Sequence, residues 1–258
     1  MRLARALPAL ALCLACGVEK SPAPEARTLL DETLKQDLST LRGAHVFFGH
    51  HSVGQNILEG LALLSKEAGI EVKIDEAPVG QNMRPLEKFE DFAKRGERNT
   101  DDGTQLMAMK LCYVDFNPRT DVDQLVDAYA AAVERVRKAR PKVRIVHVAP
   151  ALFARQVDMK SKLNRTLGRP VWEDQSNKKR LDFTRKMRAR FPDDGFFDLA
   201  SVESTRPDGT SEQYEVDGQQ VPMLWPGYSS DGGHLNDEGK LVAAKAFAHA
   251  FAQALRGP

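Results

Sequence analysis

The strongest constraint on the fold of this 258-residue chain is an alternation of short apolar runs with longer stretches of helical period. The runs have the length of buried strands, and the stretches between them carry apolar residues on one side of a helix. Strands are expected at 44–48, 70–75, 106–114, 143–149 and 196–199. Because right-handed β-α-β crossovers place helices on both faces of a sheet, this order predicts a single α/β domain with a mostly parallel, five-stranded central sheet.

Some segments between these strands have the pattern of regular helices, and others have no regular pattern. Helices are expected over 53–68, 122–136, 177–190 and 237–255, the second of them ended by Pro141. Residues 80–103 are polar with little apolar period, so an irregular or partly helical excursion is expected there, and 150–172 is predicted to be a loop-rich insertion. An Asp-Gly pair within 214–222 predicts a surface hairpin. In parallel sheets of this kind, ligands bind beyond the carboxyl ends of the strands.

The first sixteen residues have the order of a signal peptide. Arg2 and Arg5 precede an apolar run that ends at Cys16. The run is about half of the ~20 residues that a membrane-spanning helix needs, and no later run approaches that length. A small residue followed by Cys16 resembles a bacterial lipobox, in which the cysteine carries the lipid, although Cys13 stands where leucine is usual.

This start predicts a lipid-anchored protein of the bacterial cell envelope, with plain secretion as the alternative. Residues 1–16 are expected to be the signal peptide with its lipobox, 17–27 a tether, and 28–258 the folded domain. With Cys16 as the lipid anchor, only Cys112 would remain inside that domain. No internal disulfide is therefore expected.

The charge balance argues against a polyanion as partner. The chain has 37 basic and 36 acidic residues, a formal net charge of +1, and no long run of one sign. Proteins that bind nucleic acid or anionic membranes through their surface usually gather basic residues in a patch. We therefore expect no nucleic-acid partner, and contact with a membrane through the lipid anchor only.

The clearest chemical signal is the segment 229–239, just before the last helix. Asp231 and His234 are three residues apart on a turn that contains two glycines. At that spacing the carboxylate can accept from one ring nitrogen while the other nitrogen faces outward, which fixes the tautomer and supports a positive imidazole. The glycines permit the sharp backbone path. The alternative is an ordinary surface turn with a satisfied histidine.

A second signal lies where the first strand runs directly into a helix, at the sequence Gly49-His50-His51-Ser52. A serine at a helix N-terminus feels the positive end of the helix dipole, and its own N–H can support an oxyanion. Ser52 is therefore a candidate nucleophile. The alternative for Ser52 is a plain helix N-cap, which serine provides well.

Together the two segments resemble the motifs of the SGNH/GDSL hydrolase superfamily. Asp231, His234 and Gly239 match the Asp-x-x-His block and the glycine that follows it, and Ser52 stands at the position of the nucleophilic serine. The usual Gly-Asp-Ser is Gly-His-His-Ser here, with His51 in place of the aspartate. The resemblance implies a flavodoxin-like fold in which Ser52 is the nucleophile, His234 its base and Asp231 the group that orients the histidine.

The resemblance also implies an oxyanion hole made by the N–H of Ser52, a glycine after the second strand and an asparagine after the third. Gly80 matches the glycine, but Val114 occupies the position of the asparagine. The loss of one such donor typically costs on the order of 100- to 1000-fold in rate. The polar candidates for a replacement donor are Asn82, Gln81 and Asn56, with Asn82 placed in the oxyanion hole. His51 and Asn56 are expected to orient the loop or to contact substrate.

These residues predict a serine esterase or acyl hydrolase that needs no cofactor and no metal. Its expected location and the habits of the family favour deacylation or deacetylation of envelope or extracellular carbohydrate, so the expected partner is a small ester or an acylated carbohydrate. One alternative is a non-catalytic lipoprotein that keeps the fold as a binding module, which the missing asparagine favours. Another is a metal site, for which the possible ligands are His50, His51, Asp231 and His234.

Overall fold

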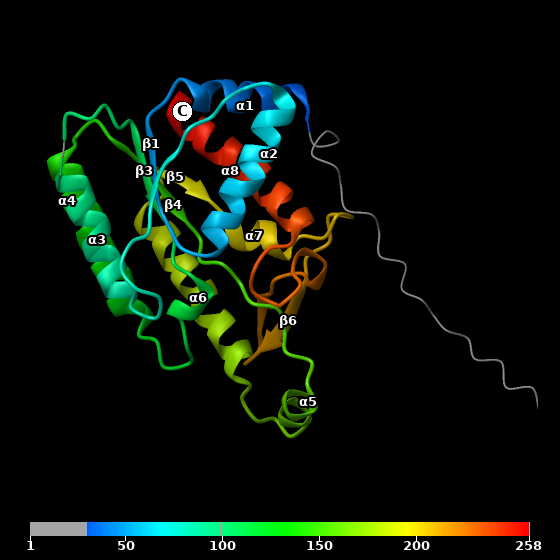
Figure 1. The fold of residues 1–258 in the computed structure, drawn as a ribbon. Coiled ribbons are helices and arrows are strands. Elements are labelled where there is room, and N and C mark those ends of the chain that lie inside the picture. Colours follow the sequence, from blue (N-terminus) through cyan, green and yellow to red (C-terminus); the bar gives the residue numbers. More distant parts are fainter. Residues whose placement is uncertain (1–29, 99, 258) are drawn as a thin grey trace, which may run out of the picture.

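The computed structural model describes residues 30–98 and 100–257, and its centre is a five-stranded sheet (Figure 1). The strands are β1 (Val46–Gly49), β2 (Asp75–Ala77), β3 (Leu106–Met109), β4 (Arg144–Val148) and β5 (Gly195–Phe197). Their order is β2-β1-β3-β4-β5, and all neighbouring pairs run parallel, which confirms the predicted α/β class. The order reverses between β1 and β3, and the loops that follow these two strands are where such sheets bind ligands.

Helices cover both faces of the sheet, as predicted. One face is covered by α1 (Glu32–Arg42), α2 (Val53–Ala68) and α8 (Asp237–Arg256), and the other by α3 (Pro85–Glu97), α4 (Val122–Ala139) and α6 (Trp172–Arg190). Adjacent residues of β1 serve the two cores. The ring of Phe48 lies 5.2 Å from that of Phe247 in α8, whereas Phe47 belongs to the core under α3 and α4. Because side chains alternate along a strand, a strand that is apolar at every position contributes to both faces.

Two of the predicted strands were wrong in their bounds. The run expected at 70–75 pairs with β1 only from Asp75 onward, as β2. The run expected at 106–114 leaves the sheet after β3, because the Asp115 carboxylate accepts the N–H of Cys112 at 2.7 Å and stabilises a short 3-10 helix, η2 (Tyr113–Asp115). The polar stretch 80–103 contains a regular helix, α3, and α1 was not predicted at all.

The later part of the chain adds smaller elements. They are α5 (Met159–Thr166), α7 (Leu199–Ser204), η3 (Pro226–Tyr228) and the antiparallel pair β6 (Gln213–Val216) and β7 (Gln219–Pro222). The predicted hairpin is confirmed: Asp217 and Gly218 both have positive φ, +50° and +74°, as a type I′ turn requires. The insertion expected to be loop-rich carries α5.

Among the described residues, no helix combines the length and apolarity that crossing a membrane requires. The predicted signal peptide 1–16, the lipid anchor Cys16 and the tether 17–27 lie outside the described residues and stay predictions.

Candidate active site

Ser52 lies at the junction of β1 and α2, beside the point where the strand order reverses. Its backbone has φ +54° and ψ −105°, a conformation that side chains rarely adopt and that costs on the order of 1–3 kcal/mol. Its hydroxyl makes no capping hydrogen bond to α2. Within 30–98 and 100–257, neither this hydroxyl nor the Ser52 N–H has a hydrogen-bond partner, so the plain N-cap role is not what the structure shows.

Asp231 and His234 form the pair that their spacing predicts. Asp231 Oδ2 lies 2.6 Å from His234 Nδ1, and Oδ1 accepts the N–H groups of Gly233 at 2.9 Å and His234 at 2.8 Å. These bonds, first of all the one to the His234 ring, hold the pKa of Asp231 well below its usual range. The carboxylate is therefore ionised at neutral pH and fixes Nδ1 of His234 as the protonated nitrogen, which leaves Nε2 as the basic one.

The loop that carries this pair depends on its two glycines. Gly232 has φ +87°, a left-handed conformation that favours glycine. Gly233 packs against Tyr113, and a Cβ at this position would lie 2.6 Å from the Tyr113 ring. The Tyr113 ring also meets the His234 ring edge to face, with 5.9 Å between centroids. The loop that carries Asp231 and His234 thus packs against Tyr113, in the loop after β3.

Asn56 connects the two segments, which are far apart in sequence. It lies one turn after Ser52 in α2, and its Oδ1 accepts the N–H of Leu235, the neighbour of His234, at 3.1 Å. The helices behind the two loops pack closely, because Gly60 of α2 lies against the backbone carbonyl of Lys240 in α8. Ser52 and the Asp231–His234 pair are therefore brought to the same edge of the sheet.

Comparison with known proteins finds relatives in fold but not in sequence. No family model and no curated protein matches the chain. One matching structure is a Streptococcus pneumonia protein provisionally described as a platelet activating factor, with a TM-score of 0.51 and 14% identity over 84% of this chain and 90% of that one. Another is the native aryl esterase of M. smegmatis, with a TM-score of 0.50 and 13% identity over 80% of this chain and 96% of that one.

The chain has the SGNH/GDSL hydrolase fold. At 13–14% identity the likeness concerns the fold alone, and any chemistry depends on the residues of this chain.

Gly80 does not offer the donor that the SGNH resemblance predicted for it. Its N–H donates to Asp91 Oδ2 at 2.8 Å, and its backbone is held at φ +54° against the start of α3. Its carbonyl, together with that of Val79, accepts from His51 Nε2 at 3.0 Å. Because the N–H is already bonded to a carboxylate, the prediction that it serves an oxyanion is corrected, whereas His51 makes a contact that orients this loop.

Asn82, on the same loop, has the properties of a donor. Its Oδ1 accepts from Lys88 Nζ at 2.9 Å, which fixes the rotation of the amide, and its NH₂ group has no partner within the described part of the chain. Val114, at the SGNH asparagine position, is 38% exposed and cannot donate. Asn82, unlike Val114, thus offers the same kind of donor as the missing asparagine.

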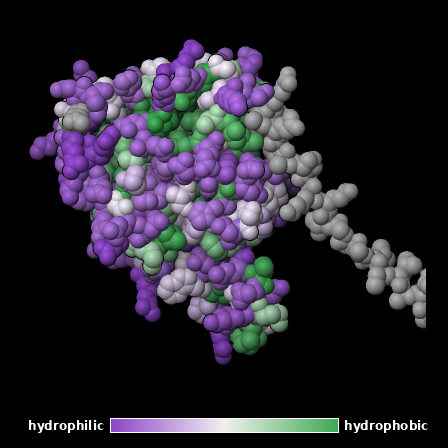
Figure 2. All heavy atoms as spheres, in the orientation of Figure 1, coloured by the Kyte–Doolittle hydropathy of each residue, from purple (hydrophilic) through white to green (hydrophobic). Residues whose placement is uncertain are grey.

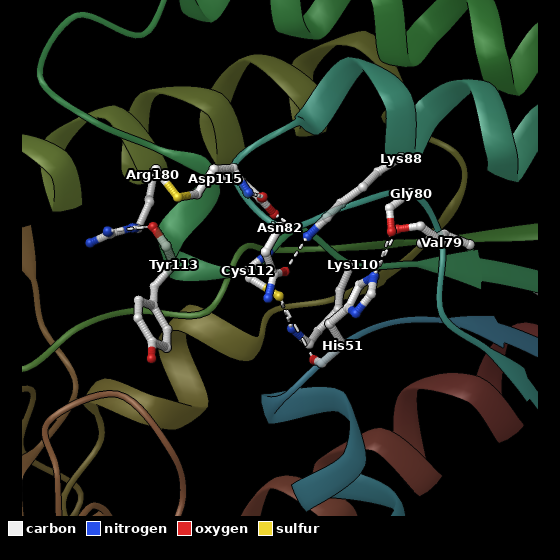
Figure 3. A network of polar contacts seen from close by, with 11 residues as sticks. His51, Val79, Gly80, Asn82, Lys88, Lys110, Cys112, Tyr113, Asp115 and Arg180 are labelled. Carbon is white, nitrogen blue, oxygen red and sulfur yellow. Dashed lines mark hydrogen bonds and ion pairs between the residues drawn. The ribbon is translucent and has the colours of Figure 1, made fainter.

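A buried ion pair lies beneath this loop (Figure 3). Lys88 and Asp115 are both completely buried, with 2.6 Å between Nζ and Oδ2. The remaining acceptor capacity of Asp115 is used by two backbone N–H groups, those of Cys112 at 2.7 Å and Met83 at 2.8 Å. The pair therefore joins the loops after β2 and β3, and Lys88 extends this connection to Asn82.

Two further residues at the site were missed by the sequence analysis. Tyr113 precedes Val114, the position at which the SGNH asparagine is lacking, and Arg180 lies in the helix expected at 177–190. Arg180 is 1% exposed, and its Nη2 donates to the carbonyl of Tyr113 at 2.6 Å. The helical period contains the signal, because Arg180 shares a face of α6 with the buried Phe183 and Met187.

The side chains considered for a metal site do not converge. His50 Nε2 lies 2.7 Å from Glu76 Oε2, the His51 ring donates to backbone carbonyls, and the His234 ring faces Asp231. In residues 30–98 and 100–257, no three His, Cys, Asp or Glu side chains are placed to hold a metal ion.

Proposed function

We propose that this protein is a serine hydrolase that cleaves ester bonds, with Ser52 as nucleophile, His234 as base and Asp231 as the group that orients the base. The observation that carries the proposal is the free, strained serine at the start of α2, on the same sheet edge as a histidine whose tautomer is fixed by a carboxylate. Strained residues of this kind concentrate at functional sites. A serine with a structural role alone would gain from capping the helix.

In the proposed reaction, Ser52 Oγ attacks the ester carbonyl carbon while His234 Nε2 takes the hydroxyl proton. The carbon–oxygen bond to the alcohol then breaks, and His234 returns the proton to the departing oxygen. Water enters with the same base, hydrolyses the acyl-serine and frees the acid. Asp231 stays ionised and stabilises the imidazolium that forms in each step.

The oxyanion of the tetrahedral intermediate would accept from the Ser52 N–H and from the amide of Asn82. Asn56 contributes by holding the backbone after His234 against α2, and His51 by holding the loop that carries Asn82. Because the N–H of Gly80 is bonded to Asp91, the oxyanion would have two hydrogen-bond donors instead of three. We therefore expect a kcat lower by on the order of 100-fold than that of a site with a complete oxyanion hole.

The open site favours an ester presented on a surface or a larger molecule. The side chains of His234 and Asp231 are 46% and 57% exposed. The aryl esterase among the structural matches supports an ester substrate in general. Within the cell envelope, where a lipid on Cys16 would hold the protein, we propose acyl or acetyl groups on carbohydrate as the substrate class.

The test is covalent labelling of the full chain with a fluorophosphonate probe. The wild type should label, and Ser52→Ala should not. Alanine at this φ is strained no more than serine, so the variant should fold. Ser65→Ala, which removes a buried hydroxyl further along the same helix, is the matched control and should label like the wild type. Labelling that persists in Ser52→Ala would refute the assignment of the nucleophile.

The second candidate is a binding module without catalysis. Val114 and the bonded N–H of Gly80 favour it, because both remove donors that the chemistry uses. A correctly folded wild type that neither labels nor turns over short activated esters would move the assignment to this candidate.

A further inference from the structure

The segment 155–172 extends from the body of the molecule and exposes its apolar side chains. Figure 1 shows α5 at the far end of the molecule from α1, and Figure 2 shows apolar residues gathered at that end. Nine large hydrophobic residues are exposed in the described chain, and five belong to this segment: Val157 at 71%, Met159 at 82%, Leu163 at 57%, Leu167 at 52% and Trp172 at 55%. Such a concentration marks an interaction surface.

The same segment carries a local excess of positive charge that the overall balance conceals. It has five basic residues and one acidic residue, whereas the whole chain has a net charge of +1. Arg155 and Arg165 are paired with Asp174. In the described part of the chain, Lys160, Lys162 and Arg169 have no ion-pair partner and are exposed. The exposed apolar residues of this segment are thus interspersed in sequence with three exposed cations that have no ion-pair partner in the described chain.

The protein holds this segment outward. Asp158 caps α5 by accepting the N–H of Ser161 at 3.0 Å, and Arg165 donates to both carboxylate oxygens of Asp174 at 2.7 and 2.8 Å. Arg165 also donates to the carbonyl of Gln156 at 2.6 Å. A helix of eight residues is marginal in isolation, so these bonds are what preserve its shape while its apolar residues stay in water.

We propose that residues 157–172 are a membrane-docking surface, which inserts its apolar side chains into the interfacial region of an anionic lipid bilayer. Exposed aliphatic residues, a tryptophan and unpaired lysines and arginines are the combination that lies in the plane of a membrane surface. The excess of free cations favours anionic lipid over an apolar protein groove, since each basic residue near an anionic surface strengthens binding by about fivefold. This contact is additional to any lipid on Cys16, and differs from the sequence-based expectation of attachment through lipid only.

Docking here would bring the candidate active site to the membrane surface. The segment begins directly after Ala154, whose N–H donates to the carbonyl of Gly232 at 2.8 Å, and Phe153 packs on Tyr113 with 5.2 Å between ring centroids. The residues that precede the docking surface therefore belong to the wall of the loop that carries His234. The docking itself does not depend on the ester chemistry.

Trp172 provides a local probe, because the chain has only two tryptophans. In the full chain with Trp225→Phe, the emission of Trp172 should shift to the blue on addition of vesicles of phosphatidylglycerol and phosphatidylcholine, and lipids brominated on their acyl chains should quench it. Residues 1–29 are the same in every variant, and binding through them alone would leave Trp172 in water. An unquenched Trp172 on vesicle-bound protein would therefore overturn the proposal.

Variants of the Trp225→Phe protein separate the contribution of the basic residues to membrane binding from that of the apolar residues. Replacing Lys160, Lys162 and Arg169 by glutamine should weaken partitioning on the order of 100-fold, and high salt should do the same to the parent. Leu163→Ser should weaken it by about tenfold. Leu63→Ser, the same change at a 48% exposed position on α2, should have no effect. Equal quenching with vesicles of phosphatidylcholine alone would contradict the role of anionic lipid in the proposal. No effect of either set of substitutions on partitioning would contradict the docking surface itself.

Discussion

Two lysines at the carboxyl edge of the sheet allow a direct test of what a buried charge costs. Lys88 and Lys110 are both completely buried. Lys88 Nζ has an ionised partner, Asp115 at 2.6 Å, and a second acceptor in Asn82 at 2.9 Å. Lys110 Nζ has only the sulfur of Cys112, at 3.4 Å, among the described residues. Methionine matches the length and apolar stem of lysine, so replacing either residue mainly removes the charge.

Only the substitution of Lys88 should lower the free energy of unfolding. Lys88→Met leaves the Asp115 carboxylate buried without its counter-charge, a change that typically costs 3–5 kcal/mol. Because two backbone N–H groups still hold that carboxylate, we expect the lower end, about 3 kcal/mol. Lys110→Met removes a buried ammonium that has no carboxylate at ion-pair distance among the described residues and interacts with the buried Glu203 only at longer range. It should be neutral or stabilise by about 1–3 kcal/mol.

Urea unfolding followed by circular dichroism measures both changes. With a slope of about 2 kcal/mol per M, the midpoint should fall by about 1.5 M for Lys88→Met and stay or rise for Lys110→Met. The double variant Lys88→Met with Asp115→Asn should recover part of the loss, because it removes both charges while the amide oxygen still accepts one of the two backbone N–H groups. Equal destabilisation by the two single variants would show that burial alone, and not the presence of a partner, decides the cost.

Two more predictions concern another buried group and the N-terminus. Burial raises the pKa of Glu203 to about 8, from an ordinary value of 4.5, so the stability that this group contributes is fully present below about pH 4.5 and is lost as the pH rises through about 8. Glutamine does not titrate, so the free energy of unfolding of Glu203→Gln, measured by urea titration, should rise relative to that of the wild type as the pH goes from 5 to 9. Free energies of unfolding that change with pH in the same way in both proteins would contradict this. Cys16→Ala should move the protein from the membrane to the soluble fraction of cells; a wild type that is already soluble would rule out the lipid anchor.

The sheet could be predicted because buried parallel strands and amphipathic helices leave clear periods in the sequence. The bounds of α2 at Val53–Ala68 match the predicted helix, since Ile57, Leu61 and Leu64 recur on one side and Gly69 follows. Helix α3 was predicted only as part of an irregular or partly helical stretch, because its apolar residues are few. Pro85 at its first turn and the buried pair Phe89 and Phe92 were the available signals.

The strand ends were harder to predict because they are decided by side chains distant in sequence. Apart from the buried Lys110, the run after Met109 stays apolar to Val114, and its pattern does not show where it leaves the sheet. It leaves because Asp115 binds the N–H of Cys112 and, at the same time, the ammonium of Lys88 from another helix. An apolar run gives the existence of a strand but not the residue at which tertiary contacts end it.

The Asp231–His234 pair could be predicted because its bonds are local, within a three-residue turn whose glycines are visible in the sequence. The role of Asn56 as a link between the two segments could not, since it spans residues 179 positions apart. Sequence also could not show that the N–H of Gly80 is bonded to Asp91, because that bond depends on where α3 packs.

In the proposed hydrolase, the loss of the oxyanion donor at Val114 and the positioning of its candidate replacement, Asn82, are connected through one buried ion pair. Val114 removes the amide donor from the loop after β3, while Asp115, the next residue, accepts the ammonium of Lys88. Lys88 in turn holds Oδ1 of Asn82 and fixes the direction of its NH₂ group. The residue beside the lost donor thus supports the candidate that replaces it, from the neighbouring loop. A motif comparison treats each loop separately and registers only the loss, because the compensation passes through a buried side chain of α3.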